Sequence, residues 1–369
     1  MIYLDEAATT KPYEDAIKLA NEVNKMLYLN PSSMYSKYEK NLLDESRQVI
    51  ADTLSVEPDE IIFTSGGSEA DNTVLKTYGK KGKHIITSAI EHHAILNTCK
   101  WLEEQGCYVT YIKPTRDGYI SQSMIERVIR PNTSLISIMT ANNEIGTIMP
   151  IKEIGEVAKR YNIPFHTDAV QAYGHIDIKV HESNISFLSA SGHKFGGIKG
   201  AGFLYCRKGQ YLEPLIHGGS QEKGLRAGTT NLSAISAMAR AAEISCSNMV
   251  DDIGLVTHIR NIVIDKLLEN KKIKLNGGFN RLPNNINIRI DGVSGEEMQY
   301  LLSEKGIYVS TGSACNSDNE EPSHVLTSIG LTEDEANSSI RITIPRYISK
   351  AEVLSVIDNI NQIAERMNV

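Results

Sequence analysis

The sequence predicts an α/β fold with a mostly parallel sheet covered by helices on both faces, followed by a smaller α/β C-terminal domain. Three observations lead to this prediction. Short apolar runs alternate with helical patterns between residues 60 and 205, polar side chains follow the ends of these runs, and a second, shorter alternation begins near residue 286. Strands that are apolar throughout are typical of parallel sheets buried between layers of helices.

The N-terminal part predicts a phosphate-binding turn. The expected elements are a strand at 2–4, helices at about 13–27 and 35–54, a strand at 60–64, and a helix from 69 onward. The last strand and helix are joined by Ser65-Gly-Gly-Ser68. A strand, a glycine turn and a helix N-terminus present free backbone N–H groups that suit an anion. A plain capped helix is an equally good interpretation of this turn, and its spacing matches neither common nucleotide-binding motif.

The middle and C-terminal parts continue the alternation. Further strands are expected at 84–88, 108–112, 135–139, 164–168, 185–188 and 203–205, with helices at 94–105, 122–129 and 151–161. Residues 229–270 are expected to be helical, followed by strands at 286–290, 307–309 and 340–344 and helices at 295–305 and 350–367. We predict a large domain at 13–250, and a small domain formed by 1–12 and 251–369.

Polar residues follow the predicted strands where ligands of such sheets bind, beyond the carboxyl ends. They are Ser65 to Ser68, Glu91 to His93, Asn142 to Glu144, Asp168 with Gln171, and Ser191 to Lys194. Each group alone could be an ordinary cap or turn. Because they follow five separate strands, we expect them to converge on one site.

Lys194 lies in a glycine-rich stretch, residues 189–202, which we expect to be a loop between two buried strands. Burial of an ammonium group is costly, so the pKa of Lys194 should fall and the neutral amine become a nucleophile able to form a Schiff base. A solvated lysine is the commoner outcome for an isolated Gly-Lys loop. The assignment therefore depends on the surrounding polar groups.

These groups match the needs of pyridoxal phosphate: a lysine for the aldehyde, an anion cradle, an acid opposite the pyridine nitrogen, and a flat group against the ring. The candidates are Lys194 for the aldehyde, Gly67 and Ser68 for the phosphate, Asp168 for the nitrogen, His92 for the ring, and Asn143 and Gln171 for the phenolic oxygen. The histidines lack the helical spacing of a metal site, so no metal is predicted.

Composition excludes several other classes of protein. The 369 residues carry a net charge of −7, which does not favour nucleic acid or an anionic membrane surface. No apolar run approaches the length of a membrane span, and no secretory signal is found, so a cytoplasmic enzyme is expected. The 5 cysteines form no C-x-x-C pair, which argues against a disulfide framework or a cysteine zinc site.

Together these motifs resemble the cysteine desulfurases of the NifS/IscS type, within the class V aminotransferase branch of fold type I pyridoxal enzymes. The resemblance spans essentially the whole chain. It is carried by residues 4–10, 63–69, 91–92, 142–146, 166–168 with 171, 191–194, 226–229, 313–315 and 339–341. It implies that Ser191 and His193 also bind the phosphate, that Arg341 binds the substrate carboxylate, and that Asn143 also binds the substrate. It also implies a homodimer in which Thr229 reaches the phosphate of the other subunit.

Cys315 lies in a polar stretch, residues 311–321, that the resemblance places near the substrate. We hypothesise that L-cysteine displaces Lys194 from the cofactor, and that the Cys315 thiolate then attacks the substrate sulfur. The products are L-alanine and a persulfide, with Lys194 and His92 moving protons. The sulfur acceptor is expected to be an iron–sulfur scaffold or a tRNA-thiolating enzyme, and direct binding to nucleic acid or a membrane is not expected.

Two other interpretations remain. The nearest is another class V enzyme, a selenocysteine lyase or an aminotransferase, that does not use Cys315. The second is a non-catalytic dimer that has kept the fold, against which the presence of Lys194, Asp168, His92 and Arg341 argues.

Overall fold

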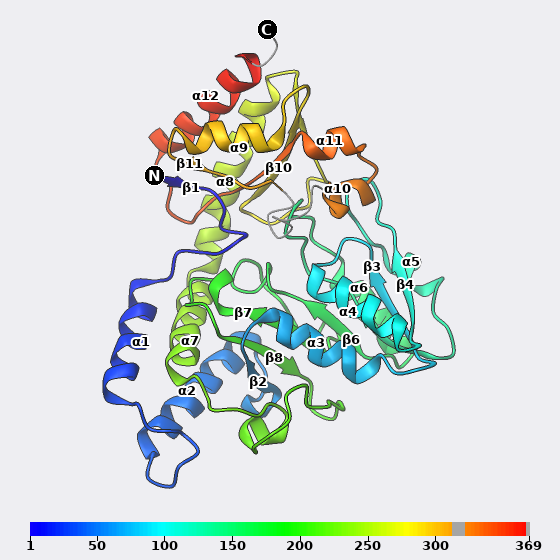
Figure 1. Cartoon of the computed structure of the whole chain (residues 1–369), viewed down its shortest axis with the longest axis vertical. Coiled ribbons are helices and arrows are strands. Elements are labelled where there is room, and N and C mark those ends of the chain that lie inside the picture. The colour runs from blue at the N-terminus through cyan, green and yellow to red at the C-terminus, as the bar shows by residue number, and fades with distance from the viewer. Residues whose placement is uncertain (312–321, 367–369) are drawn as a thin grey trace.

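The computed structural model describes residues 1–311 and 322–366 (Figure 1). Its largest sheet has seven strands in the order β2-β8-β7-β6-β5-β3-β4. Their bounds are β2 Ile61–Thr64, β3 His84–Ser88, β4 Tyr108–Ile112, β5 Thr133–Ser137, β6 Phe165–Asp168, β7 Phe187–Ser191 and β8 Gly202–Cys206. Each predicted strand of this region is present, with bounds shifted by at most three residues.

Strand direction explains why the polar groups meet. Strands β7, β6, β5, β3 and β4 pair in parallel, whereas β8 is antiparallel to both of its neighbours, β7 and β2. Strand β2 therefore runs in the same direction as the parallel strands. The carboxyl ends of all strands except β8 lie at one edge of the sheet, which is where a ligand site forms in such folds.

Helices cover both faces of this sheet. They are α1 Glu14–Met26, α2 Lys37–Leu54, α3 Gly67–Tyr78, α4 His93–Glu104, α5 Gln122–Glu126, α6 Ile151–Arg160 and α7 Leu232–Ser247. Consecutive strand residues contact opposite layers: Ile85 packs in a cluster with residues of α3 and α4, and Ile86 in a cluster with residues of α2, α6 and α7. Both faces of the sheet are therefore buried, which explains why its strands are apolar throughout. The predicted fold class is confirmed.

The C-terminal part forms a smaller α/β unit above the central sheet in Figure 1. An antiparallel sheet orders β12 (Ser339–Thr343), β10 (Asn285–Ile290) and β9 (Ile273–Leu275). Helices α8 (Met249–Leu268), α9 (Gly295–Ser303) and α12 (Lys350–Arg366) pack with it around a separate apolar cluster. Strand β1 (Ile2–Tyr3) pairs in parallel with β11 (Ile307–Tyr308), so the N-terminal strand joins this unit. The exact domain boundaries stay a prediction.

Some predicted elements were wrong in detail. The helical stretch 229–270 is two helices, α7 and α8, which meet at Asn248 and begin only at Leu232. The glycine-rich stretch is not a loop throughout, because Ser189 to Ser191 extend β7 and a 3-10 helix, η2 (Gly192–Lys194), follows directly. The short elements β9, α10 (His324–Ser328) and α11 (Glu333–Asn337) were not predicted.

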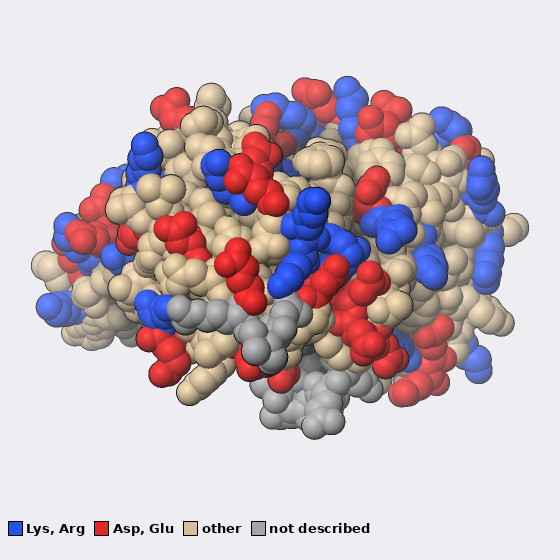
Figure 2. Space-filling model, turned by 90° about the horizontal axis from the view of Figure 1, so that it is seen from above, with Lys and Arg blue, Asp and Glu red and all other residues tan. Residues whose placement is uncertain are grey.

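Surface charge, helix length and the grouping of possible ligand side chains show which nucleic-acid, membrane and metal contacts the described residues are suited to. Positive and negative side chains are interspersed over the face shown in Figure 2, which presents no continuous basic stripe. Within residues 1–311 and 322–366, no helix has the length and apolar character needed to cross a bilayer. The same residues contain no group of three or more His, Cys, Asp or Glu side chains arranged to hold a metal ion.

Candidate active site

Lys194 is fixed by the N-terminal segment. Its Nζ donates to the carbonyl oxygens of Ala7 at 2.6 Å and Ala8 at 2.9 Å. Thr10 N donates to the carbonyl of His193 at 2.9 Å, so the same segment also holds the backbone beside the lysine. Because Lys194 follows directly after β7, its amine lies near the edge of the sheet where the strands end. The residues that hold it, 7–10, are distant from it in sequence.

Asp168 lies at the end of β6, with 5% of its surface exposed. Its Oδ1 accepts a hydrogen bond of 2.8 Å from Val170 N. Burial raises the pKa of Asp168 to about 6, while the positive charge of Lys194 acts in the opposite direction. The carboxylate and the predicted reactive amine are thus close enough to influence each other's charge.

Asp71 and His166 form a buried pair close to Asp168, whose charge acts on Asp71. The Oδ1 of Asp71 is 3.5 Å from Nε2 of His166, which also contacts Ser189 Oγ at 3.0 Å. Burial lowers the pKa of His166 to about 3 and raises that of Asp71 well above its usual value. The imidazole of His166 is therefore neutral at physiological pH, and the positive charge that acts on Asp168 is that of Lys194.

Gly67 and Ser68 begin helix α3, as the phosphate prediction requires. The residue before them, Gly66, provides no side-chain cap, and the first N–H groups of a helix have no partner within it. A Cβ on Gly202 would lie 2.6 Å from the Cα of Gly66, so the start of β8 packs directly against this turn. The hydroxyl of Ser191 lies beside the turn, because a Cβ on Gly66 would be 3.5 Å from Ser191 Oγ.

The other predicted phosphate ligands lie in two segments. His193 is partly buried in η2, and its Nδ1 lies 3.1 Å from Thr9 Oγ1. Thr229 is exposed, three residues after Arg226, whose Nε lies 2.9 Å from Glu69 Oε1 on α3. This ion pair ties the segment that carries Thr229 to the helix that begins the cradle. Contact of either residue with a phosphate stays a prediction.

His92 caps helix α4, and its Nδ1 accepts from Ala94 N at 3.1 Å. Burial, with a smaller effect of the Lys194 charge, lowers the pKa of His92 to about 4, so the ring is neutral at physiological pH. Because Nδ1 accepts a hydrogen bond, the ring proton is on Nε2. Gln171 donates to Ala7 O at 2.9 Å, the same carbonyl that Lys194 contacts.

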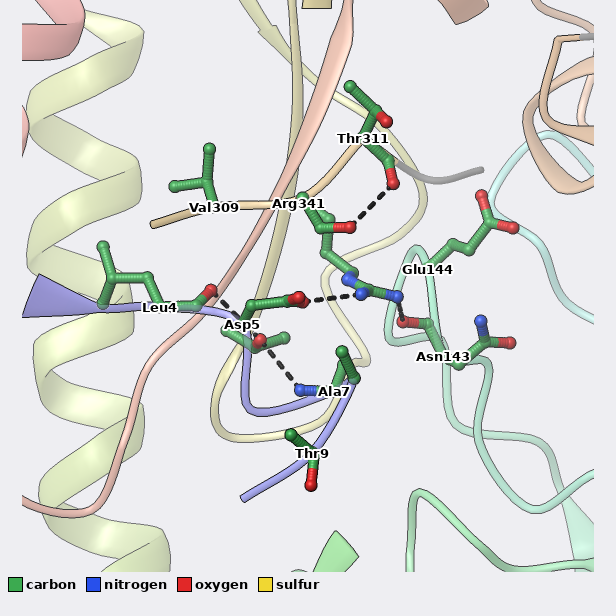
Figure 3. A network of polar contacts seen from close by, with 12 residues as sticks. Leu4, Asp5, Ala7, Thr9, Asn143, Glu144, Val309, Thr311 and Arg341 are labelled. Atoms are coloured by element: carbon green, nitrogen blue, oxygen red, sulfur yellow. Dashed lines mark hydrogen bonds and ion pairs between the residues drawn. The ribbon is translucent and has the colours of Figure 1, made fainter. Parts of the chain in front are cut away.

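Arg341 lies on β12 with 4% of its surface exposed. Its Nη2 donates to Asp5 Oδ1 at 2.7 Å and its Nη1 to the carbonyl of Asn143 at 3.0 Å, as Figure 3 shows. Its Nε has no hydrogen-bond partner among the described residues. The sequence reasoning missed the contact with Asp5, although Asp5 belongs to one of the motifs that carry the family resemblance.

Cys315 lies outside the described residues, so its role stays a prediction. The chain enters that segment from beside Arg341, because the backbones of Ser310 and Arg341 exchange hydrogen bonds of 3.1 and 2.6 Å. The four other cysteines are free thiols, and Cys99 and Cys107 are buried.

The chemistry of these groups fits pyridoxal phosphate. The charge of the Lys194 amine acts on both the Asp168 carboxylate and the His92 imidazole. An uncapped helix N-terminus at the same sheet edge can receive a phosphate.

Comparisons with known proteins agree with this arrangement. The profile of the family described as aminotransferase class V matches residues 2–356. The chain belongs to the class V aminotransferase family. The enzymes of this family depend on pyridoxal phosphate, and the predicted cofactor is thereby confirmed.

Individual class V relatives support the resemblance to cysteine desulfurases. The chain is 45% identical over 373 aligned positions to a cysteine desulfurase IscS of Methanosarcina thermophila, covering 99% of this chain and 92% of the relative. A solved structure named as a NifS-like protein superimposes with a TM-score of 0.92 at 34% identity, covering 99% of both chains. A structure described as SspA in complex with cysteine has a TM-score of 0.83 at 38% identity, covering 95% of this chain and 100% of that one.

A pH prediction arises from Glu91, which precedes His92. Its Oε1 accepts from Ser88 Oγ at 2.6 Å and from Met139 N at 3.1 Å, while Oε2 has no hydrogen-bond partner in the described part of the chain. Burial raises its pKa from 4.5 to about 8. The stability that the protonated form contributes is present below pH 4.5 and is lost as the pH rises through about 8.

Glu91→Gln keeps the shape of this side chain without the charge. The variant is expected to unfold like the original protein at pH 4, below both pKa values, and to be more stable at pH 9 by an amount on the order of a few kcal/mol. Urea unfolding of the cofactor-free proteins at both pH values measures this difference. The exposed Glu104→Gln serves as the control, and an equal free-energy difference at both pH values would contradict the prediction.

Proposed function

We propose that this chain is a cysteine desulfurase that converts L-cysteine to L-alanine and collects the sulfur as a persulfide on Cys315. The observation that carries the proposal is the contact set of residues 5–8. Asp5 holds Arg341, while the carbonyls of Ala7 and Ala8 hold Lys194. One short segment therefore positions both Arg341 and Lys194. The guanidinium suits a carboxylate, and the amine can exchange with an amino group. A carboxylate and an amino group are the two groups by which an α-amino acid is recognised.

The residues have distinct roles in the proposed reaction. Gly67, Ser68, Ser191 and His193 would hold the phosphate of the cofactor, with Thr229 contributed by the other subunit. Asp168 would face the pyridine nitrogen, His92 the ring, and Asn143 and Gln171 the phenolic oxygen. Pyridoxal phosphate, when bound, supplies an electron sink for charge at the substrate α-carbon.

The chain's own side chains carry out the remaining steps. Arg341 binds the substrate carboxylate, and Lys194, once its amine is released, takes the α-proton. The neutral ring of His92, with its proton on Nε2, is able to donate a proton. The Cys315 thiolate forms a bond to the substrate sulfur as the carbon–sulfur bond breaks. L-cysteine and one thiol thus become L-alanine and one persulfide, without an external oxidant.

The proposal includes a homodimer in the cytoplasm. Large apolar side chains are exposed in and around the connection between α1 and α2, and this set comprises Met26, Tyr28, Met34, Tyr35 and Tyr38. An exposed apolar group of this kind is typical of an association surface, and a second copy of the chain would cover it. The sulfur acceptor would be an iron–sulfur scaffold, in keeping with the IscS names of the relatives, or a tRNA-thiolating enzyme.

The test compares alanine and sulfide release from L-cysteine, in the presence of a reductant, between the original protein and Cys315→Ala at equal pyridoxal phosphate occupancy. We expect equal amounts of both products from the original protein, and a loss of both by about 10²-fold or more in the variant, because the attacking thiolate is missing. Cys206→Ala removes a partly buried thiol elsewhere and serves as the control. Full activity of Cys315→Ala would instead indicate a class V enzyme that does not use this thiol.

A further inference from the structure

The turn Asn142–Gly146 connects parts of the protein that are far apart in sequence. The side-chain oxygen of Asn142 accepts from the N–H groups of Glu144 at 2.9 Å and Ile145 at 3.0 Å, which closes the turn. On one side, the carbonyl of Asn143 accepts from Arg341. The turn is therefore rigid and is already part of the substrate-binding region.

Strand β10 of the C-terminal unit also holds this turn. The carbonyl of Glu144 accepts from the side-chain amides of Asn285 and Asn287, each at 3.2 Å. Figure 3 shows Glu144 next to Asn143, in the stretch that the Arg341 guanidinium contacts. The backbone of Glu144 is thus fixed relative to both Arg341 and the smaller sheet.

The side chain of Glu144 is buried, with 4% of the residue exposed, and it binds a residue that lies 179 positions later. Ser323 Oγ donates to Glu144 Oε2 at 2.5 Å. The same hydroxyl accepts from Leu326 N at 3.2 Å as the cap of helix α10. Both hydrogen-bonding roles of the Ser323 hydroxyl are therefore used, and the bond to Glu144 helps to hold this hydroxyl at the cap.

The residue after Ser323 is tied to the central sheet as well. His324 contacts the carbonyl of Glu91 through Nε2 at 3.0 Å, and its ring lies 4.7 Å from that of His93 between centroids. The start of α10 is consequently fastened to the large unit at two points. Ser310, at the other end of the intervening segment, is bonded to Arg341.

We propose that Glu144 is a positioning residue, whose carboxylate holds Ser323 and thereby fixes the point at which the Cys315-bearing segment rejoins the structure near Arg341. The inference rests on the proposed function of Cys315. Glu144 touches neither the substrate nor the cofactor in this role. Its effect falls on the transfer of sulfur to Cys315, because Cys315 is only eight positions before Ser323 in the sequence and a reacting group must be held near its partner.

Two pairs of variants test the role. Glu144→Ala and Ser323→Ala remove the hydrogen bond, whereas Glu144→Gln and Ser323→Thr keep an acceptor or a hydroxyl. In the holoenzyme, both alanine variants should form persulfide from one equivalent of L-cysteine about 10-fold more slowly, the usual scale for a lost buried hydrogen bond. KM for L-cysteine should stay within about twofold, and the conservative variants should recover most of the rate.

Hydrogen exchange gives a readout that needs no turnover. In the alanine variants, the amides of residues 324–328 should exchange about 10-fold faster, because the cap of α10 is weakened. Glu153→Ala, an exposed glutamate on α6, is the matched control and should change neither readout. If Glu144→Ala does not fold, Ser323→Ala and Ser323→Thr carry the same comparison.

The outcomes separate this inference from the proposed function. Persulfide formation at the original rate in Glu144→Ala and Ser323→Ala, or a rise in KM that accounts for the whole loss, would overturn the positioning role while Cys315→Ala remained inactive. Poor rates in Glu144→Gln and Ser323→Thr, equal to those of the alanine variants, would also overturn it. Full activity of Cys315→Ala would remove the proposed function itself.

Discussion

Replacing Lys194 with alanine is expected to lower alanine release from L-cysteine by about 10³-fold, the scale of losing a positioned proton-transfer group. The amine is held by the carbonyls of Ala7 and Ala8, and its charge acts on both Asp168 and His92. A water molecule or free amine in its place would lack this orientation. The measurement is alanine release at saturating pyridoxal phosphate and L-cysteine.

Lys199→Ala is the matched control, because Lys199 is an exposed lysine only five positions later in the same glycine-rich stretch. It should keep full activity. Retention of more than about a tenth of the activity by Lys194→Ala, at equal cofactor occupancy, would show that the amine is not the proton-transfer group.

Asp168→Asn is expected to have the second largest effect, a loss of about 10²-fold in kcat, in the range reported for a group that stabilises developing charge. A neutral amide cannot hold the pyridine nitrogen in its protonated form. Alanine release and the visible spectrum of the bound cofactor report on this change. Asp177→Asn, at an exposed aspartate nine positions later, should leave both unchanged.

Asp168→Asn should lower activity but raise the stability of the cofactor-free protein. Burial raises the pKa of Asp168 from 3.8 to about 6, so the stability of the protonated form is present below 3.8 and is lost as the pH rises through 6. At pH 8 the asparagine variant should therefore be more stable than the original protein, by about 3 kcal/mol. A variant that loses both activity and stability would indicate a structural role for Asp168.

Sequence reasoning predicted the central sheet because its signals are local. Apolar runs such as 84–88 and 108–112 are strands, with the predicted bounds unchanged in the structure. The convergence of Asp168, His92 and Lys194 also followed, because parallel strands bring their carboxyl ends to one edge. The elements β9 and α10 were missed because their few residues form neither a continuous apolar run nor a clear periodic pattern.

The contacts that complete the site could not be predicted from sequence in the same way. The pairing of Asp5 with Arg341 joins residues 336 positions apart, and that of Lys194 with Ala7 joins residues 187 positions apart. No local pattern marks a backbone carbonyl as a lysine partner. Ser323 and Glu144 are similarly separated, and each alone is typical of an ordinary cap or turn residue.

The pairing of the first strand has a consequence for how the protein is made. Residues 2 and 3 leave the ribosome first, but their partners at 307 and 308 are among the last to be synthesised. The partners of Asp5, Thr343 and Arg341, are synthesised later still. The central sheet is complete by residue 206, so a nascent chain can fold it during translation. The reactive lysine would acquire its carbonyl partners in their final place only after nearly all of the chain has emerged, which delays catalytic competence until synthesis is almost finished.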